Sequence, residues 1–141
     1  MIKKIAGLVL LAGVAGFALI QLVPYGRNHS NPPVVKEPVW NTPQTRDLAQ
    51  RACFDCHSNE TVWPGYSNIA PISWLIQRDV DEGRRRLNFS EWGMGRQRLR
   101  ELAEVIGEDH MPPVYYVLLH PNAQLTPAEK EIFINGLTTL K

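Results

Sequence analysis

The chain contains two cysteines, and both lie in the run Cys53-Phe54-Asp55-Cys56-His57. This C-x-x-C-H spacing is the attachment signature of c-type haem, in which two thiols bond to the two vinyl groups along one edge of the porphyrin. The next residue then falls beneath the iron and can serve as its proximal ligand. The sequence therefore predicts one covalent haem c, held by Cys53 and Cys56 and ligated by His57, around which the domain must fold.

Other uses of the two cysteines are less consistent with the pattern. A disulfide that closes so small a loop would be strained and would stabilise little. A thioredoxin-type pair needs a neighbouring βαβ pattern, which is absent here. A structural zinc site needs four ligands, usually from two such pairs, and the remaining histidines, His29, His110 and His120, are not spaced as a partner pair. A different redox or metal role stays open as the alternative.

The N-terminus predicts a membrane anchor over residues 1–24. Lys3 and Lys4 precede an apolar run from Ile5 to Val23 in which Gln21 is the only strongly polar side chain. A helix of that length rises about 28 Å, close to the thickness of a bilayer core. Because haem c is attached outside the cytoplasm and basic flanks stay inside, we expect a single-pass protein of the inner membrane whose haem domain faces the periplasm. The alternative is a cleaved signal peptide with a weak site at residues 13–15.

Composition limits the remaining choices. The 141 residues suffice for an anchor and one small domain, and the formal net charge of +1 gives no sign of nucleic-acid binding. Residues 25–42 are rich in proline and predict a stiff linker. Alternatively, this segment wraps along the domain through its apolar side chains, Val34, Val35, Val39 and Trp40. The basic run at residues 84–86 is expected to be a solvated helix surface, with a docking patch or a haem propionate contact as alternatives.

Residues 43–141 predict an all-α domain. Thr42 and Pro43 are typical of a helix start, and that helix leads into the cysteine motif. A second helix is expected from Pro71 to about Leu87, and a third from a cap at Ser90 to a stop at Gly107. A capping box at residues 126–129 begins the last helix, whose predicted inner face is Ile132, Phe133, Gly136, Leu137 and Leu140.

The sixth iron ligand is predicted to be Met111. It precedes Pro112 and Pro113, which cannot continue a helix and would stiffen a loop across the haem face. Methionine opposite histidine is a known axial pair in cytochromes c. A buried core methionine is the alternative for Met111. Met94, His29, His110, His120 or an open sixth site are further alternatives for the ligand. Four aromatic side chains could line the haem pocket or simply pack in the core: Trp63, Tyr66, Trp74 and Trp92.

Two resemblances are carried by these residues. The helix that leads into C-x-x-C-H, the Met-Pro loop and the last helix resemble those of class I cytochromes c. The resemblance implies that the last helix crosses the first one closely, which Gly136 of this chain would allow. Residues 59–109, in the middle, do not resemble ordinary small cytochromes c. Nearly all of the chain beyond the anchor is more similar to the bacterial family of haem-binding domain proteins. The shared motifs are residues 24–29, 53–61, Trp63-Pro64, Tyr66-Ser67, Ala70-Pro71, Trp74, Asp79-Val80, residues 82–84, residues 87–92, residues 111–113 and residues 119–121. Gly65 departs from the family, where an aromatic residue often stands.

The resemblance implies a membrane-anchored or exported single-haem protein without settling a reaction. With His57 and Met111 filling both axial positions, we expect an electron carrier that works with membrane or periplasmic redox proteins and is not an enzyme. A haem-based sensor or gas-binding module would need a weak or absent sixth ligand. A weak peroxidase would need an open iron and a distal acid–base group such as Glu108 or His110.

Overall fold

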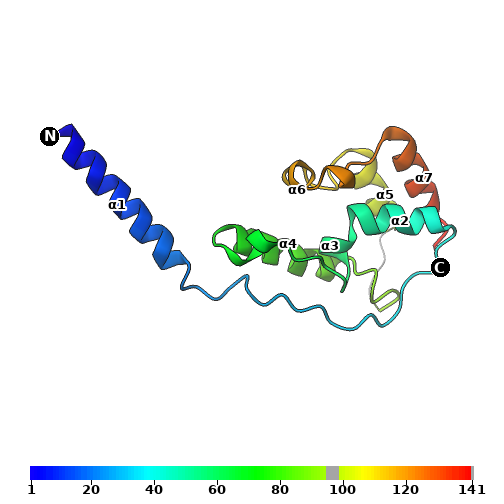
Figure 1. Cartoon of the computed structure of the whole chain (residues 1–141). Helices are drawn as coiled ribbons and strands as arrows, with labels where there is room; N and C mark the ends of the chain where they lie inside the picture. The colour runs from blue at the N-terminus through cyan, green and yellow to red at the C-terminus, as the bar shows by residue number, and fades with distance from the viewer. Residues whose placement is uncertain (95–98, 141) are drawn as a thin grey trace. The chain divides into compact units, whose positions relative to one another are not determined.

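The computed structural model describes residues 1–94 and 99–140, whose helices are drawn in Figure 1. These residues divide into two compact units. One unit consists of Met1–Ser30 and Trp63–Asp79, and the other of Asn31–Val62 and Val80–Lys141. The described residues form helices and no β-strand, which confirms the predicted all-α class. An isolated parallel bridge joins Lys36 to Glu91.

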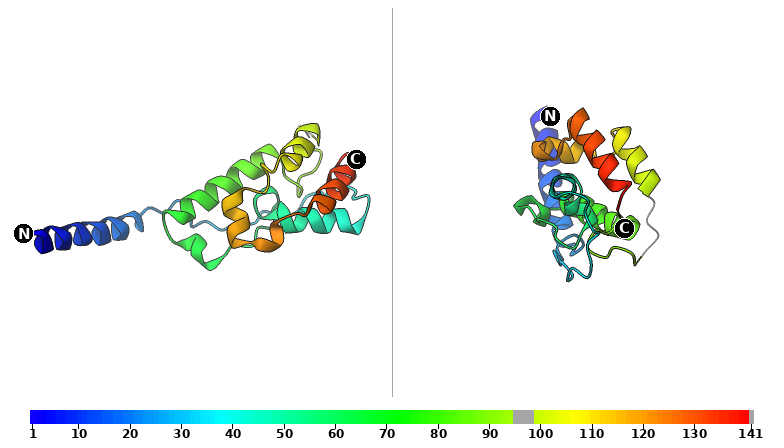
Figure 2. Two further views of the ribbon diagram at one scale, coloured as in Figure 1. Left: turned by 90° about the horizontal axis from the view of Figure 1, so that it is seen from above. Right: turned by 90° about the vertical axis from the view of Figure 1, so that its right-hand side faces the viewer.

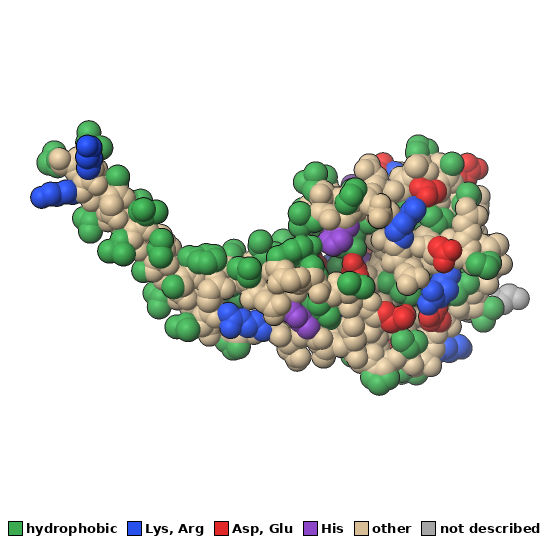
Figure 3. All heavy atoms as spheres, in the orientation of Figure 1, with side chains coloured by type: hydrophobic (Ala, Val, Ile, Leu, Met, Phe, Trp, Pro, Cys, Tyr) green, Lys and Arg blue, Asp and Glu red, His purple; other side chains and the backbone are tan. Residues whose placement is uncertain are grey.

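The N-terminal helix α1 runs from Ile2 to Ile20, so it begins three residues before the predicted apolar run. All but its last residue are exposed, and its most apolar stretch has a mean hydropathy of 1.9. Figure 3 shows hydrophobic side chains along its length. The helix is long and apolar enough to cross a membrane, a property that it shares with signal sequences.

Helix α2, Pro43–Ala52, begins as the sequence predicts. The Thr42 side chain accepts a hydrogen bond from the Thr45 N–H, and Pro43 occupies the first helical position. Helix α2 packs against the last helix, α7, Pro127–Leu137 (Figure 2). A methyl group on Gly136 of α7 would lie 2.5 Å from the Thr45 side chain. The predicted role of Gly136 in a close crossing is therefore confirmed.

Helix α7 carries the predicted capping box, in which Thr126 and Glu129 satisfy each other's backbone N–H groups. Three residues of its predicted inner face, and Leu140 beyond it, are buried as expected. Ile132 is 39% exposed, so its inward placement was wrong. Ile134 packs against the core instead. The two residues are two positions apart and therefore lie on different sides of the helix.

Helix α4, Ile72–Arg86, matches the second predicted helix within a residue at each end. The third prediction was partly wrong. Among the described residues, helix α5 runs from Leu99 to Gly107 and so ends where expected. Ser90 does not cap a helix, because its hydroxyl accepts a hydrogen bond from the Asn59 N–H across the fold. Residues 90–94 form turns and a bridge, and residues 95–98 of the predicted helix lie outside the described residues.

The second unit has an aromatic core. The Phe89 ring lies 5.5 Å from the Phe54 ring and 5.8 Å from the Trp92 ring, centre to centre. Trp40 joins them at 5.4 Å from Phe89. Each fully buried aromatic ring contributes on the order of 1.5–3 kcal/mol by leaving water. This core stands directly beside the cysteine motif, since Phe54 is the residue between Cys53 and Asp55.

The proline-rich segment contributes Trp40 to this core. Upstream of Trp40, Lys36 pairs with residues 90–92 through two backbone hydrogen bonds, from its N–H to Ser90 and from Trp92 to its carbonyl. Glu37 accepts hydrogen bonds from Arg46 and from the Trp40 indole. The three valines of this segment stay exposed. Residues 33–40 therefore lie along the second unit, held by backbone pairing and by Trp40.

Candidate haem-binding site

The cysteine motif forms one short turn of helix. Helix α3, Phe54–His57, follows α2 directly, and Cys53 is at once the C-cap of α2 and the N-cap of α3. The His57 N–H donates to the Cys53 carbonyl at 2.8 Å. Neither cysteine forms a disulfide, and both are half-buried. Burial, with a smaller effect from Cys56, raises the pKa of the Cys53 thiol to about 12, so that side chain is protonated near neutrality.

The His57 imidazole is oriented by helix α4. Its Nδ1 lies 3.0 Å from the Gly83 carbonyl oxygen and 3.1 Å from the Leu87 carbonyl oxygen. Since both partners are acceptors, Nδ1 carries the proton and Nε2 keeps a lone pair. Burial lowers the pKa of His57, which favours the neutral ring. A neutral imidazole whose second nitrogen is held by backbone carbonyls is the usual arrangement of a metal-binding histidine.

Gly83 brings α4 against the motif. A methyl group at this position would lie 2.2 Å from the Cys56 carbonyl oxygen, so only a glycine permits this contact between the two backbones. Gly83 lies inside the helix predicted from Pro71 to about Leu87. A glycine inside an otherwise regular helical pattern signals close packing, and this was the signal available for it.

Asp55, between the two cysteines, ties α3 to its surroundings. Its carboxylate accepts hydrogen bonds from the Tyr116 hydroxyl at 2.6 Å and from the Val62 N–H at 2.9 Å. Tyr116 belongs to helix α6, Val114–Leu119. Burial and the contact with Asp55 raise the pKa of Tyr116, so the hydroxyl remains the donor. Sequence reasoning missed this pair, because no local pattern connects residues so far apart.

The residues after His57 are held by a second group of polar contacts. The Arg84 guanidinium donates to the Ser58 carbonyl at 2.8 Å and to the Thr61 hydroxyl at 3.0 Å. The Asn88 side chain donates to that of Asn59 at 2.9 Å. Arg84 therefore has a structural role, whereas Arg85 and Arg86 are exposed and contact Glu82 of the same helix. Only the latter two match the solvated surface expected for the basic run.

A cavity of about 630 Å³ opens beside His57. The lining residues are His57 of α3 and residues from the end of α4, the turn after it, α5 and the loop that follows α5: Arg84, Arg85, Arg86, Leu87, Asn88, Glu91, Met94, Leu99, Glu101, Leu102, Val105 and Met111. Its size is typical of pockets for cofactor-sized ligands. This lining fits a porphyrin with two carboxylates. The apolar side chains would face the ring, the imidazole and the two thioethers could bind the iron, and the arginines could pair with the carboxylates.

Met111 reaches this cavity from the loop after α5. The N–H groups of His110 and Met111 both donate to the Val105 carbonyl, at 2.9 and 3.1 Å, which fixes the start of the loop. Met111 is 37% exposed. The structure thus brings His57 and Met111 to one cavity, as the axial-ligand prediction requires. Met94 lines the same cavity, so it is the second thioether available there.

The three other histidines do not line this cavity. His29 belongs to the first unit, where it stacks on Trp63 and contacts Ser67. His110 is exposed beside Glu108. His120 is the C-cap of α6, and its Nδ1 lies 3.0 Å from the Tyr116 carbonyl oxygen.

The four aromatic candidates are not among the lining residues either. Trp63, Tyr66 and Trp74 belong to the first unit, and Trp92 is buried in the aromatic core. Among residues 1–94 and 99–140, no group of three or more His, Cys, Asp or Glu side chains is arranged to hold a metal ion.

These features define a class: a small helical domain whose C-x-x-C-H turn and facing cavity are suited to a haem. The family model described as "Haem-binding domain" matches residues 15–139, so the chain belongs to the haem-binding domain family. It is a haem-binding protein, as the resemblance in its motifs indicated. No curated protein and no solved structure matches it.

Proposed function

We propose that this protein is a membrane-anchored monohaem c-type cytochrome that carries electrons outside the cytoplasm. Bound haem supplies a one-electron iron couple. Cys53 and Cys56 would hold the porphyrin through thioether bonds, and His57 would bind the iron through Nε2. The observation that carries the proposal is that His57 and Met111, the two predicted axial residues, line one cavity.

The protein's own contribution would be to fix the potential and exclude other chemistry. The carbonyls of Gly83 and Leu87 make the His57 imidazole a stronger donor. The Met111 thioether would occupy the position that a substrate or gas needs, and it favours ferrous iron. This is why we infer a carrier and not an enzyme, with membrane or periplasmic redox proteins as partners.

Helix α1 would keep the carrier at the inner membrane. Its length, hydropathy and exposure support a span, and Lys3 and Lys4 favour a cytoplasmic N-terminus. Export reporters fused after Lys141 should be active, and the protein should stay in membranes after a salt wash. A soluble mature form that begins near Gly16 would show a cleaved signal. Mass spectrometry of the matured protein should find one added haem, and free thiols would refute covalent attachment.

The axial ligand is tested with a pair of methionine variants. Met111→Ala should abolish the weak near-infrared band of ferric iron–methionine ligation, lower the potential by on the order of 100 mV and open the iron to carbon monoxide. Met94→Ala, from the same cavity, is the matched control and should leave all three unchanged. If the wild-type protein binds carbon monoxide and neither variant changes the spectrum, the electron-carrier proposal fails. A sensor or gas-binding role then takes its place.

A further inference from the structure

The segment just after α1 is clamped to the loop that leads into α4. The Gln21 side chain donates to the Ala70 carbonyl at 2.9 Å and accepts from the Ala70 N–H at 3.0 Å. Gly26 has a φ of +82°, and a methyl group there would lie 2.4 Å from the Ser73 carbonyl oxygen. Residues 21–26 and 70–73 therefore form one closely packed structure within the first unit.

Apolar side chains point to solvent from both sides of this clamp. On the loop and on the first turn of α4, Ile69, Ile72 and Leu75 are between 41% and 47% exposed. Ile72 and Leu75 are three residues apart and share one side of the helix, whereas Ser73 between them is buried. Beyond the end of α1, Leu22, Val23 and Tyr25 are exposed as well. The apolar surface thus continues past α1 onto a second segment.

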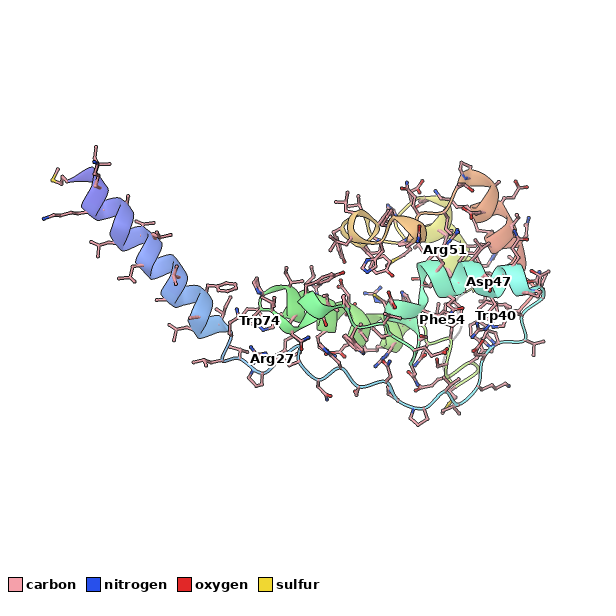
Figure 4. All side chains as sticks on the ribbon, in the orientation of Figure 1. Arg27, Trp40, Asp47, Arg51, Phe54 and Trp74 are labelled. Carbon is pink, nitrogen blue, oxygen red and sulfur yellow. The ribbon has the colours of Figure 1, made fainter. Side chains whose placement is uncertain are left out.

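The charge and aromatic content of this region also differ from those of the rest of the chain. Asp79 is the one acidic residue in residues 1–30 and 63–79, although the chain has 14. Arg27 and Arg78 are exposed basic residues in these ranges. Tryptophan and tyrosine are enriched where a membrane meets water, and these segments contain four: Tyr25, Trp63, Tyr66 and Trp74. Figure 4 shows Arg27 and Trp74 close to the C-terminal end of α1.

We propose that the loop over residues 63–71 and the first turns of α4 form an interfacial membrane anchor. Ile69, Ile72 and Leu75 would enter the boundary between headgroups and acyl chains, in the leaflet from which α1 emerges. Arg27 and Arg78 would lie at the level of the phosphates, where anionic lipids attract basic side chains. The proposal rests on the proposed span by α1, and its occupant is the phospholipid surface itself, because the clamp at Gln21 makes this apolar surface continuous with that span.

Photocrosslinking in the full-length holoprotein tests this anchor. The probe p-benzoylphenylalanine replaces one residue at a time in protein reconstituted into vesicles of phosphatidylethanolamine and phosphatidylglycerol. Ile72→p-benzoylphenylalanine tests the interface, and Val14→p-benzoylphenylalanine tests the span. Leu118→p-benzoylphenylalanine, at an exposed apolar position of α6 in the second unit, is the control. After irradiation, lipid adducts are measured by mass spectrometry.

We expect lipid adducts at residues 14 and 72, and at least fivefold fewer at residue 118. Adducts at 14 without adducts at 72 would overturn the interfacial anchor and leave the span intact. No adduct at 14 would refute the span and the anchor with it. Equal yields at 72 and 118 would show that the contact is not specific, and a covalent dimer through residue 72 would show that a second copy of the chain, and not lipid, covers this surface. Either result overturns the proposal.

Discussion

Replacing Gly83 with alanine should damage the site at its closest backbone contact. The added methyl group would lie 2.2 Å from the Cys56 carbonyl oxygen and 3.1 Å from Cys56 Cβ. Since real contacts of this kind keep about 3.0 Å, α4 and α3 must separate by about 0.8 Å. That movement also carries the Gly83 carbonyl away from His57 Nδ1, which is one of its two acceptors.

The magnitude follows from three contributions. Overpacking costs about 1–3 kcal/mol, and weakening one hydrogen bond costs about 0.5–1.5 kcal/mol. Alanine in place of glycine inside a helix returns up to about 1 kcal/mol. The net loss is therefore about 2 kcal/mol, which lowers the melting temperature of a domain of this size by roughly 8–16 °C.

Thermal unfolding of the holoprotein in detergent, followed by circular dichroism, measures this loss. Gly107→Ala is the matched control, because its methyl group would meet only Ile134 Cδ1, at 3.9 Å, and stability should stay the same or rise slightly. A second readout separates the site from general packing. A weaker hydrogen bond to Nδ1 makes His57 a poorer donor, so the reduction potential of Gly83→Ala should rise. An unchanged melting temperature and potential would refute the reasoning.

Three further changes test other contacts. Gly136→Ala places a methyl group 2.5 Å from the buried Thr45 side chain and should cost about 1–3 kcal/mol in chemical denaturation, with part of the loss recovered when Thr45→Ala is added. Tyr116→Phe removes the hydroxyl that donates to Asp55 and should lower the unfolding free energy by about 1 kcal/mol without altering the mass of the attached haem. Hydrogen bonds within the capping box, followed by the ion pair with Arg51 of α2, lower the pKa of the Glu129 carboxyl to about 2. The ionised carboxylate therefore stabilises the folded protein above pH 4.5, and this stabilisation is lost as the pH falls toward 2. The difference in melting temperature between wild type and Glu129→Gln should accordingly shrink from pH 6 to pH 2, and a constant difference would argue against the linkage.

The sequence predicted well those features whose causes are local. The caps at Thr42 and Thr126 lie within three residues of the groups that they satisfy, so α2 and α7 begin where expected. Ser90 looked like another cap, but its hydroxyl is used by Asn59, which lies 31 residues away along the chain. Such a competing long-range contact leaves no signature in the adjacent residues.

The site shows the same division. The sequence predicted Cys53, Cys56 and His57 from their spacing and Met111 from its two prolines. It could not predict the groups around them, because the acceptors of His57 are backbone carbonyls, which every residue has. Side-chain identity says nothing about which carbonyl is used; only the packing of α4 against α3 decides it.

The two acceptors of His57 also impose an order in time. Gly83 and Leu87 follow His57 by 26 and 30 residues. A ribosome needs roughly one to six seconds to add that many residues, at 5–20 per second. During this interval the newly made C-x-x-C-H turn has no α4 against it, and the two carbonyls that hold its imidazole have not yet been made. The helix that fixes the ring is thus synthesised after the residues that it fixes.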